Sequence, residues 1–329
     1  MRDFLAITGP TTSGKTQLSI AVAEALDGEI ICMDSRQIYR GMDIGTDKVS
    51  AAHRDRVPHH GLDVRDPDEL YSAGQFSRDA RRWIEEISGR GRVPLLVGGT
   101  GLFLRSLTHP IFEQPDIDAV RLRALRGFMA RRSRVELERW VGALDPGRTN
   151  IAREGGPQRL GRTIEVALLT GRPLSWWHAH GTPDNEPLRG LIVVLDQDRE
   201  ELDRRIDARV TRMVADGLVD EVQGLLDKGY GPKDPGMSGT GYREVAAYVC
   251  GDMTLAEALD RMRSQTRQYA RRQLTWFRNQ LPKDAMHVDT SQPLDTQVAG
   301  VMAAWQAQAQ AEAPAMDGSG RKDGSRRDG

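Results

Sequence analysis

The segment GPTTSGKT at residues 9–16 constrains the fold of this chain more than any other feature. Its Gly-x4-Gly-Lys-Thr spacing is the phosphate-binding loop pattern, which requires a strand before it and a helix after it. The apolar run at residues 4–7 and the apolar periodicity of residues 18–26 supply both. Backbone N–H groups and Lys15 can then surround phosphoryl oxygens, and Thr16 can offer its hydroxyl to a phosphate-bound magnesium ion. We predict a phosphate site made of Gly9, Pro10, Thr11, Thr12, Ser13, Gly14, Lys15 and Thr16.

Short apolar segments alternate with amphipathic ones along the chain. Strands are predicted at residues 4–8, 29–33, 93–97 and 191–195, and long helices at 199–226 and 255–279. This alternation is typical of an α/β fold, here a P-loop NTPase-like parallel sheet flanked by helices.

The stretch from residue 115 to 189 departs from this alternation, because it contains helical patterns and no comparable strand. Residues 120–140 carry seven arginines against two glutamates, which favours a surface that faces a polyanion, although a solvated helix face would show the same pattern. We therefore expect an α/β core at residues 1–114 and 190–307, an all-helical insertion subdomain at 115–189, and a disordered tail at 308–329.

The composition of the chain further limits the class of protein it can be. The 329 residues carry a formal net charge of −1, and no apolar run is long enough for a membrane span or a cleavable signal. A cytoplasmic, soluble protein is expected. Cys32 and Cys250 lie far apart and are interpreted as small core residues, with no disulfide or metal cluster between them.

A phosphate-transferring enzyme with this loop also needs a carboxylate at the end of a strand. The strand at 93–97 ends in Gly98-Gly99-Thr100-Gly101, which has none, whereas the strand at 29–33 is followed by Asp34. In a parallel sheet Asp34 would lie beside the phosphate loop, as a magnesium ligand, a general base or a turn cap. Polar and aromatic residues follow it at 35–39 and suit a nucleobase.

Five blocks of the sequence, in order, resemble the tRNA dimethylallyltransferase family, also called tRNA isopentenyltransferases. They are DSRQIYRGMDIGTDK at 34–48, HGLDVRDP at 60–67 with YSAGQF at 71–76, PLLVGGTGLFL at 94–104, GYRE at 241–244 and TRQYARRQLTWFR at 266–278. The resemblance, which includes DP at 145–146 and QRLGR at 158–162, spans residues 4–280. One departure is Gly155-Gly156, where the family usually carries Asn-Asp.

The resemblance implies a prenyltransferase that moves a dimethylallyl group from dimethylallyl diphosphate to N6 of the adenosine at tRNA position 37, releasing diphosphate. Asp34 would be the general base and Thr100 would orient N6. The phosphate loop would hold the diphosphate with Mg2+, and Arg209, with Arg205 as a second candidate, would reach it from the helix after residue 195.

The resemblance also assigns tRNA contacts. Those around the flipped nucleotide are Asp34, Ser35, Arg36, Gln37 and Thr100, and those to the anticodon stem-loop are Arg121, Gln158, Arg159, Leu160, Gly161 and Arg162. At 100° per residue, Arg267, Arg271 and Arg278 share one helix face, which we expect to contact tRNA phosphates, with Tyr269 and Trp276 on the opposite, packing face. A monomer would suffice.

Three other interpretations stay open at this stage. An isopentenyltransferase acting on free AMP or ATP would share the loop and Asp34 without needing the arginine-rich insertion. A P-loop kinase would use ATP as phosphate donor. A non-catalytic RNA-binding protein would keep the loop as a relic.

Overall fold

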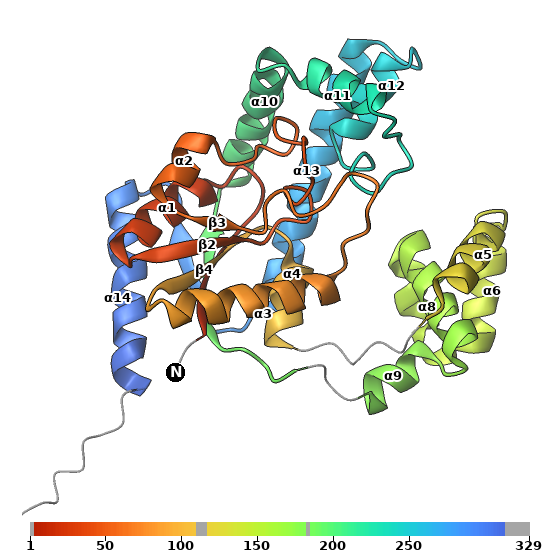
Figure 1. Ribbon diagram of the computed structural model, residues 1–329, viewed down its shortest axis with the longest axis horizontal. Coiled ribbons are helices and arrows are strands. Elements are labelled where there is room, and N and C mark those ends of the chain that lie inside the picture. Colours follow the sequence, from red (N-terminus) through yellow and green to blue (C-terminus); the bar gives the residue numbers. More distant parts are fainter. Residues whose placement is uncertain (1–2, 110–116, 182–184, 313–329) are drawn as a thin grey trace, which may run out of the picture. The chain divides into compact units, whose positions relative to one another are not determined.

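The computed structural model describes residues 3–109, 117–181 and 185–312, which form two compact units. The core unit contains Met1–Leu104 and Leu188–Gly329, and the second unit is Arg105–Pro187 (Figure 1). The second unit begins ahead of the predicted boundary at residue 115, which itself lies outside the described residues. Each unit has a core of its own.

The core unit is built on a parallel sheet with the strand order β3-β2-β4-β1-β5-β6. Its strands are β1 (Phe4–Thr8), β2 (Gly28–Cys32), β3 (His59–His60), β4 (Val93–Gly98), β5 (Gly190–Asp196) and β6 (Met286–Asp289). The predicted parallel α/β fold and its four strands are confirmed. The short strands β3 and β6 were not predicted.

Helices of the core unit connect and cover these strands (Figure 1). They are α1 (Lys15–Ala25), α2 (Ala51–Arg56), α3 (Ala73–Gly89), α4 (Gly101–Thr108, which crosses the unit boundary), α10 (Arg199–Ala215), α11 (Leu218–Asp227), α12 (Tyr242–Val249), α13 (Leu255–Gln280) and α14 (Leu294–Glu312). The predicted helix over 199–226 is interrupted at Gly217, whose φ of 99° favours glycine. None of the described helices is long and apolar enough to cross a membrane.

Two apolar clusters organise the core unit. In the first, Leu18 and Val22 of α1 pack against sheet residues such as Leu5, Ile7 and Leu95. The second joins α10, α11 and α12 to the segment that follows β2, through buried residues that include Ile38, Tyr39, Met42, Val210, Val222 and Tyr242. The segment after Asp34 is therefore anchored on helices from the far end of the chain.

The carboxyl ends of β1, β2 and β4 are tied together. The hydroxyl of Thr8 donates to the carbonyl of Gly98 at 2.8 Å, and the N–H of Met33 donates to the carbonyl of Val97 at 2.7 Å. The N–H of Thr100 in turn donates to the carbonyl of Met33 at 3.2 Å. A Cβ atom on Gly98 would lie 2.0 Å from the Met33 oxygen, so glycine allows this close approach.

The second unit is helical throughout its described residues outside the connecting turns. It contains α5 (Ala119–Met129), α6 (Arg134–Leu144), η1 (Pro146–Arg148), α7 (Thr149–Glu154), α8 (Gly156–Thr170) and α9 (Leu174–His180). A small core of Met129, Val141, Ala152, Leu160 and Ile164 holds it together.

Two expectations from the sequence need correction. Cys32 is buried as expected, but Cys250 is exposed at the end of α12, because that helix packs through its other face. The expected start of a tail at residue 308 is wrong, since α14 continues to Glu312; residues 313–329 lie outside the described part.

The approach of Gly98 to Met33 generates a prediction. Gly98→Ala places a methyl group 2.0 Å from a backbone oxygen, well inside the van der Waals contact distance, and should lower the free energy of unfolding by about 2 kcal/mol or more. Gly89→Ala is the matched control, because no atom beyond its chain neighbours and its own helix backbone lies within 4 Å of its Cβ position. Urea unfolding of both variants measures the difference, and equal midpoints would contradict the prediction.

Candidate active site

The loop between β1 and α1 has the geometry of an anion cradle. Thr12 and Gly14 have left-handed φ angles of 64° and 88°, a backbone conformation found in anion-binding loops. The hydroxyls of Thr12 and Ser13 are buried and have no hydrogen-bond partner among the described residues. Buried hydroxyls lose free energy without a partner, and the oxygens of a bound phosphate would supply one.

Lys15, the first residue of α1, lies folded over this loop. Its Nζ donates to the carbonyl oxygens of Gly9 at 3.0 Å and Pro10 at 2.6 Å. Burial lowers the pKa of Lys15 to about 8, while the nearby charge of Asp34 acts in the opposite direction. The ammonium therefore lies within the electrostatic reach of both the loop and Asp34.

Two arginines of α10 reach the same loop. Arg209 donates to the hydroxyl of Thr11 at 2.6 Å, and Arg205 approaches the carbonyl of Thr12 at 3.5 Å. Burial lowers the pKa of Arg209, and the charges of Asp47 and Asp34 oppose that shift. The structure thus brings both arginines to the loop, Arg209 more closely.

Asp34 and Thr100 follow two neighbouring strands, β2 and β4, and their turns are linked. An oxygen of the Asp34 carboxylate accepts the N–H of Arg36 at 2.8 Å. The hydroxyl of Thr100 accepts the N–H of Ser35 at 3.1 Å. A carboxylate and a hydroxyl are therefore held next to each other at the edge of the sheet where the phosphate loop begins.

Tyr269 of α13 completes this side of the site. Its pKa rises to about 12, chiefly through burial and then through the charge of Asp34, and its hydroxyl lies in the surroundings of Thr100. The sequence placed Tyr269 on a packing face, and the structure shows that this face packs onto the candidate catalytic residues.

The segment expected to bind a nucleotide is partly engaged within the protein. Arg36 donates to the carbonyl of Pro235 at 2.8 Å. The side-chain amide of Gln37 accepts from the thiol of Cys32 at 3.2 Å and donates to the carbonyls of Thr46 and Asp47, each at 3.2 Å. Gln37 therefore holds the turn of this segment, and its side chain remains only partly exposed.

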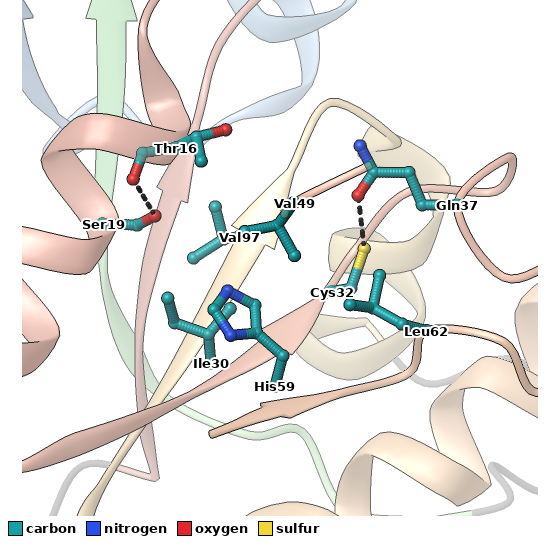
Figure 2. A pocket seen from close by; sticks show the side chains of 9 residues that line it. All are labelled: Thr16, Ser19, Ile30, Cys32, Gln37, Val49, His59, Leu62 and Val97. Carbon is teal, nitrogen blue, oxygen red and sulfur yellow. Dashed lines mark hydrogen bonds between the residues drawn. The ribbon is translucent and has the colours of Figure 1, made fainter. Parts of the chain in front are cut away.

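A recess opens beside the phosphate loop on the α1 face of the sheet (Figure 2). It is lined by Thr16, Ser19, Ile30, Cys32, Gln37, Val49, His59, Leu62 and Val97. Figure 2 shows the Cys32–Gln37 hydrogen bond on one side and Thr16 on the other, with aliphatic side chains between them. The recess leaves space next to the residue expected to contact a metal ion.

The donor set fits a magnesium ion only if the substrate provides most of the ligands. No group of three His, Cys, Asp or Glu side chains in the described part of the chain is arranged to hold a metal. Thr16 is exposed at the start of α1, next to the unpartnered hydroxyls of the loop. Mg2+ commonly uses one or two protein oxygens together with substrate phosphates and water.

Residues assigned to the anticodon stem-loop lie in the second unit. Gln158 and Arg159 are exposed on the first turn of α8, with Gly161 and Arg162 half-buried, and Arg121 is exposed on α5. Leu160 differs, because its side chain is 1% exposed and belongs to the core of the unit. Leu160 therefore anchors α8 and offers no side-chain surface to RNA.

The Gly-Gly departure has a visible consequence. The N-terminus of α8 has no side-chain cap, as expected from Gly155-Gly156. A Cβ atom on Gly155 would lie 1.9 Å from Cδ of Arg159, so the glycine leaves space for that arginine to cross the turn.

Fewer arginines are unpaired than the sequence suggested. Within the insertion Arg126 pairs with Glu165 at 2.6 Å and Arg134 with Glu138 at 2.8 Å. On α13, Arg267 pairs with Asp207 and Arg271 lies 3.6 Å from Asp203. These two arginines connect α13 to α10 while their side chains stay partly exposed, and Arg278 is exposed. That this face contacts tRNA phosphates stays a prediction.

Sequence reasoning missed two supporting residues. The carboxylate of Glu221 on α11 accepts the N–H groups of residues 43–45 at 2.8, 2.7 and 3.1 Å, together with the hydroxyl of Tyr242. Gln273 of α13 contacts the phosphate loop and the turn before Thr100. Gln273 lies in one of the five family blocks, and this was the only sequence feature that pointed to a role for it. Glu221 lies outside all five blocks.

Lys15 generates a pH prediction. Its pKa of about 8 means that the ammonium is charged below that pH and loses its proton above it. The affinity for inorganic diphosphate should therefore weaken as pH rises through 8, relative to a Lys15→Met variant that has no titrating group there. Calorimetry at pH 7 and 9.5 tests this, and a constant ratio of the two dissociation constants would contradict it.

Comparisons with known proteins identify the family of this chain. The family model described as IPP transferase matches residues 37–280. A tRNA dimethylallyltransferase of Geobacter metallireducens is 44% identical over 84% of this chain and 89% of its own length. The full-length tRNA isopentenylpyrophosphate transferase of Bacillus halodurans superposes with a TM-score of 0.69 at 34% identity, covering 94% of this chain and 98% of that one. A eukaryotic dimethylallyltransferase acting on tRNA gives a TM-score of 0.80 at 26% identity, over 97% and 82% of the two chains. This chain belongs to the IPP transferase family, the tRNA dimethylallyltransferases.

Proposed function

We propose that this protein transfers the dimethylallyl group of dimethylallyl diphosphate to N6 of the adenosine at tRNA position 37. The products are N6-dimethylallyladenosine in tRNA and diphosphate. The observation that carries the proposal is the meeting of Asp34, Thr100 and the phosphate loop at the carboxyl edge of three adjacent strands. The names of the relatives support dimethylallyl transfer to tRNA.

The nucleophile needs help from the protein. The lone pair of the adenine amino group is delocalised into the ring, and its proton becomes acidic only as the new C–N bond forms. Asp34 accepts that proton, and the Thr100 hydroxyl, held by the N–H of Ser35, orients N6 towards the allylic carbon. Holding the reacting atoms in this geometry lowers the activation free energy, because the entropy cost of orienting them is met when the substrates bind.

The leaving group is stabilised on the other side of the site. Negative charge grows on the bridging oxygen as the C–O bond breaks, and it faces Lys15, Arg209 and the N–H groups of the loop. Mg2+ held by the diphosphate and Thr16 would neutralise part of this charge. No residue that positions water is required, because the acceptor is an amine.

The helical unit supplies a surface for the anticodon stem-loop. Arg121, Arg159 and Arg162 lie on its helices α5 and α8, and arginines bind phosphates strongly. Extruding the target base costs a few kcal/mol and is easiest in a single-stranded loop. The proposed mechanism calls for no residue of a second chain, and we propose that the protein acts as a monomer in the cytoplasm.

The decisive experiment incubates the protein with unmodified tRNA and labelled dimethylallyl diphosphate and analyses the nucleosides. Prenylated adenosine next to the anticodon is expected. Equal transfer to free AMP would instead support an AMP-directed enzyme, and strong competition by ATP against the prenyl donor would argue that the loop is an ATP site.

Asp34→Asn tests the general base. Removing the carboxylate should lower kcat by about 100-fold or more, while the dissociation constant for tRNA changes less than threefold. Asp284→Asn is the control for the loss of one negative charge, because Asp284 is exposed and distant in sequence from Asp34. Weakened tRNA binding with normal turnover at saturation would reject the role of Asp34 as base.

Arg159→Gln combined with Arg162→Gln tests the tRNA surface. The double variant should bind tRNA more weakly, and the slope of log affinity against log salt should fall by about one unit per lost phosphate contact. Arg82→Gln on α3 removes an exposed arginine of the core unit and serves as control. An unchanged slope in the double variant would assign these arginines to a solvated surface.

A further inference from the structure

Gln273 of α13 connects the two halves of the site through its side-chain amide. Its oxygen accepts the N–H of Thr11 in the phosphate loop at 2.9 Å. Its nitrogen donates to the carbonyl of Gly99 at 2.8 Å, in a bond that is fully buried. The side chain is 7% exposed, so water does not readily replace the buried bond to Gly99.

The surroundings of Gln273 are shaped for this contact. A Cβ atom on Gly99 would lie 2.2 Å from the amide nitrogen and 3.3 Å from the carbonyl of Gly9. Any larger residue at position 99 would therefore displace the amide. Gly99 directly precedes Thr100, so the amide contacts the peptide that carries one candidate catalytic side chain and the loop that holds the diphosphate.

Thr11 is held from two helices at once. Gln273 of α13 occupies its N–H, and Arg209 of α10 donates to its hydroxyl at 2.6 Å. The two helices are themselves joined by the pair between Arg267 and Asp207. The phosphate loop is therefore fixed relative to the sheet edge by side chains from outside the loop.

We propose that Gln273 is a positioning residue that sets the phosphate loop relative to the Thr100 turn. This proposal rests on the proposed function. In that reaction, Gln273 would align the breaking C–O bond with the attacking N6. Gln273 touches neither reacting atom. It acts through Thr11, which fixes the diphosphate, and through Gly99, which fixes Thr100. An error of about 1 Å in such an alignment lowers rates by about 100-fold.

Gln273→Met removes both hydrogen bonds while keeping the length of the side chain. We expect kcat at saturating substrates to fall by about 10- to 100-fold, with KM for tRNA changed less than twofold. Gln268→Met, on an exposed position of the same helix, should leave kcat unchanged. A Gln273→Met enzyme with normal kcat and only a lower melting temperature would overturn the proposal, because it would show a structural role alone.

Gly99→Ala disrupts the same contact from the opposite side. If both variants act by separating the amide from the loop, their effects on kcat should not add in the double variant. Additive losses would overturn the proposal.

The dissociation constant for inorganic diphosphate separates this proposal from the proposed function. Gln273→Met should weaken diphosphate binding about fivefold or more, whether or not the wild-type protein transfers a prenyl group. Absence of transfer by the wild-type protein would reject the function alone. Unchanged diphosphate affinity and unchanged kcat in Gln273→Met would reject the positioning role alone.

Discussion

The hydrogen bonds between the carboxyl ends of β1, β2 and β4 are the constraint on which the rest of the site depends. One functional segment follows each strand. The phosphate loop follows β1, Asp34 follows β2 and Thr100 follows β4. Because Thr8 bonds to Gly98 and Met33 bonds to both Val97 and Thr100, these segments start from nearly fixed positions. A backbone scaffold of this kind allows a base and a leaving-group site to face one substrate.

Helices from the second half of the core unit add side chains to the site at the sheet edge. Arg209 of α10 and Gln273 of α13 converge on Thr11, and the acid–arginine pairs between those helices keep the two side chains together. These pairs are partly exposed, so salt screens them, and each adds only modestly to the stability of the contact between α13 and α10.

The segment after Asp34 is held by a buried lysine and a half-buried glutamate. Lys48, whose side chain is 1% exposed, donates to the carbonyl of Tyr39 and to the carboxylates of Asp43 and Asp63. Glu221 accepts three consecutive N–H groups of the same turn. Buried charges of this kind are tolerated only when they are paired or fully hydrogen-bonded. Their pairing fixes Asp47, which contacts Arg212 at 2.8 Å and lies 3.7 Å from Arg209.

The sequence by itself determined the parallel α/β class, the phosphate loop, the position of Asp34 and the helical insertion, because periodicity and motif spacing are local properties. It also led to the family, through blocks that relatives share. Only the tertiary structure decided which arginines are free and which are paired, that Leu160 is core and Cys250 exposed, and that Tyr269 and Gln273 belong to the site. These outcomes depend on contacts between residues far apart in the chain, such as Thr11 and Gln273, and no local pattern encodes which distant partner a side chain will meet.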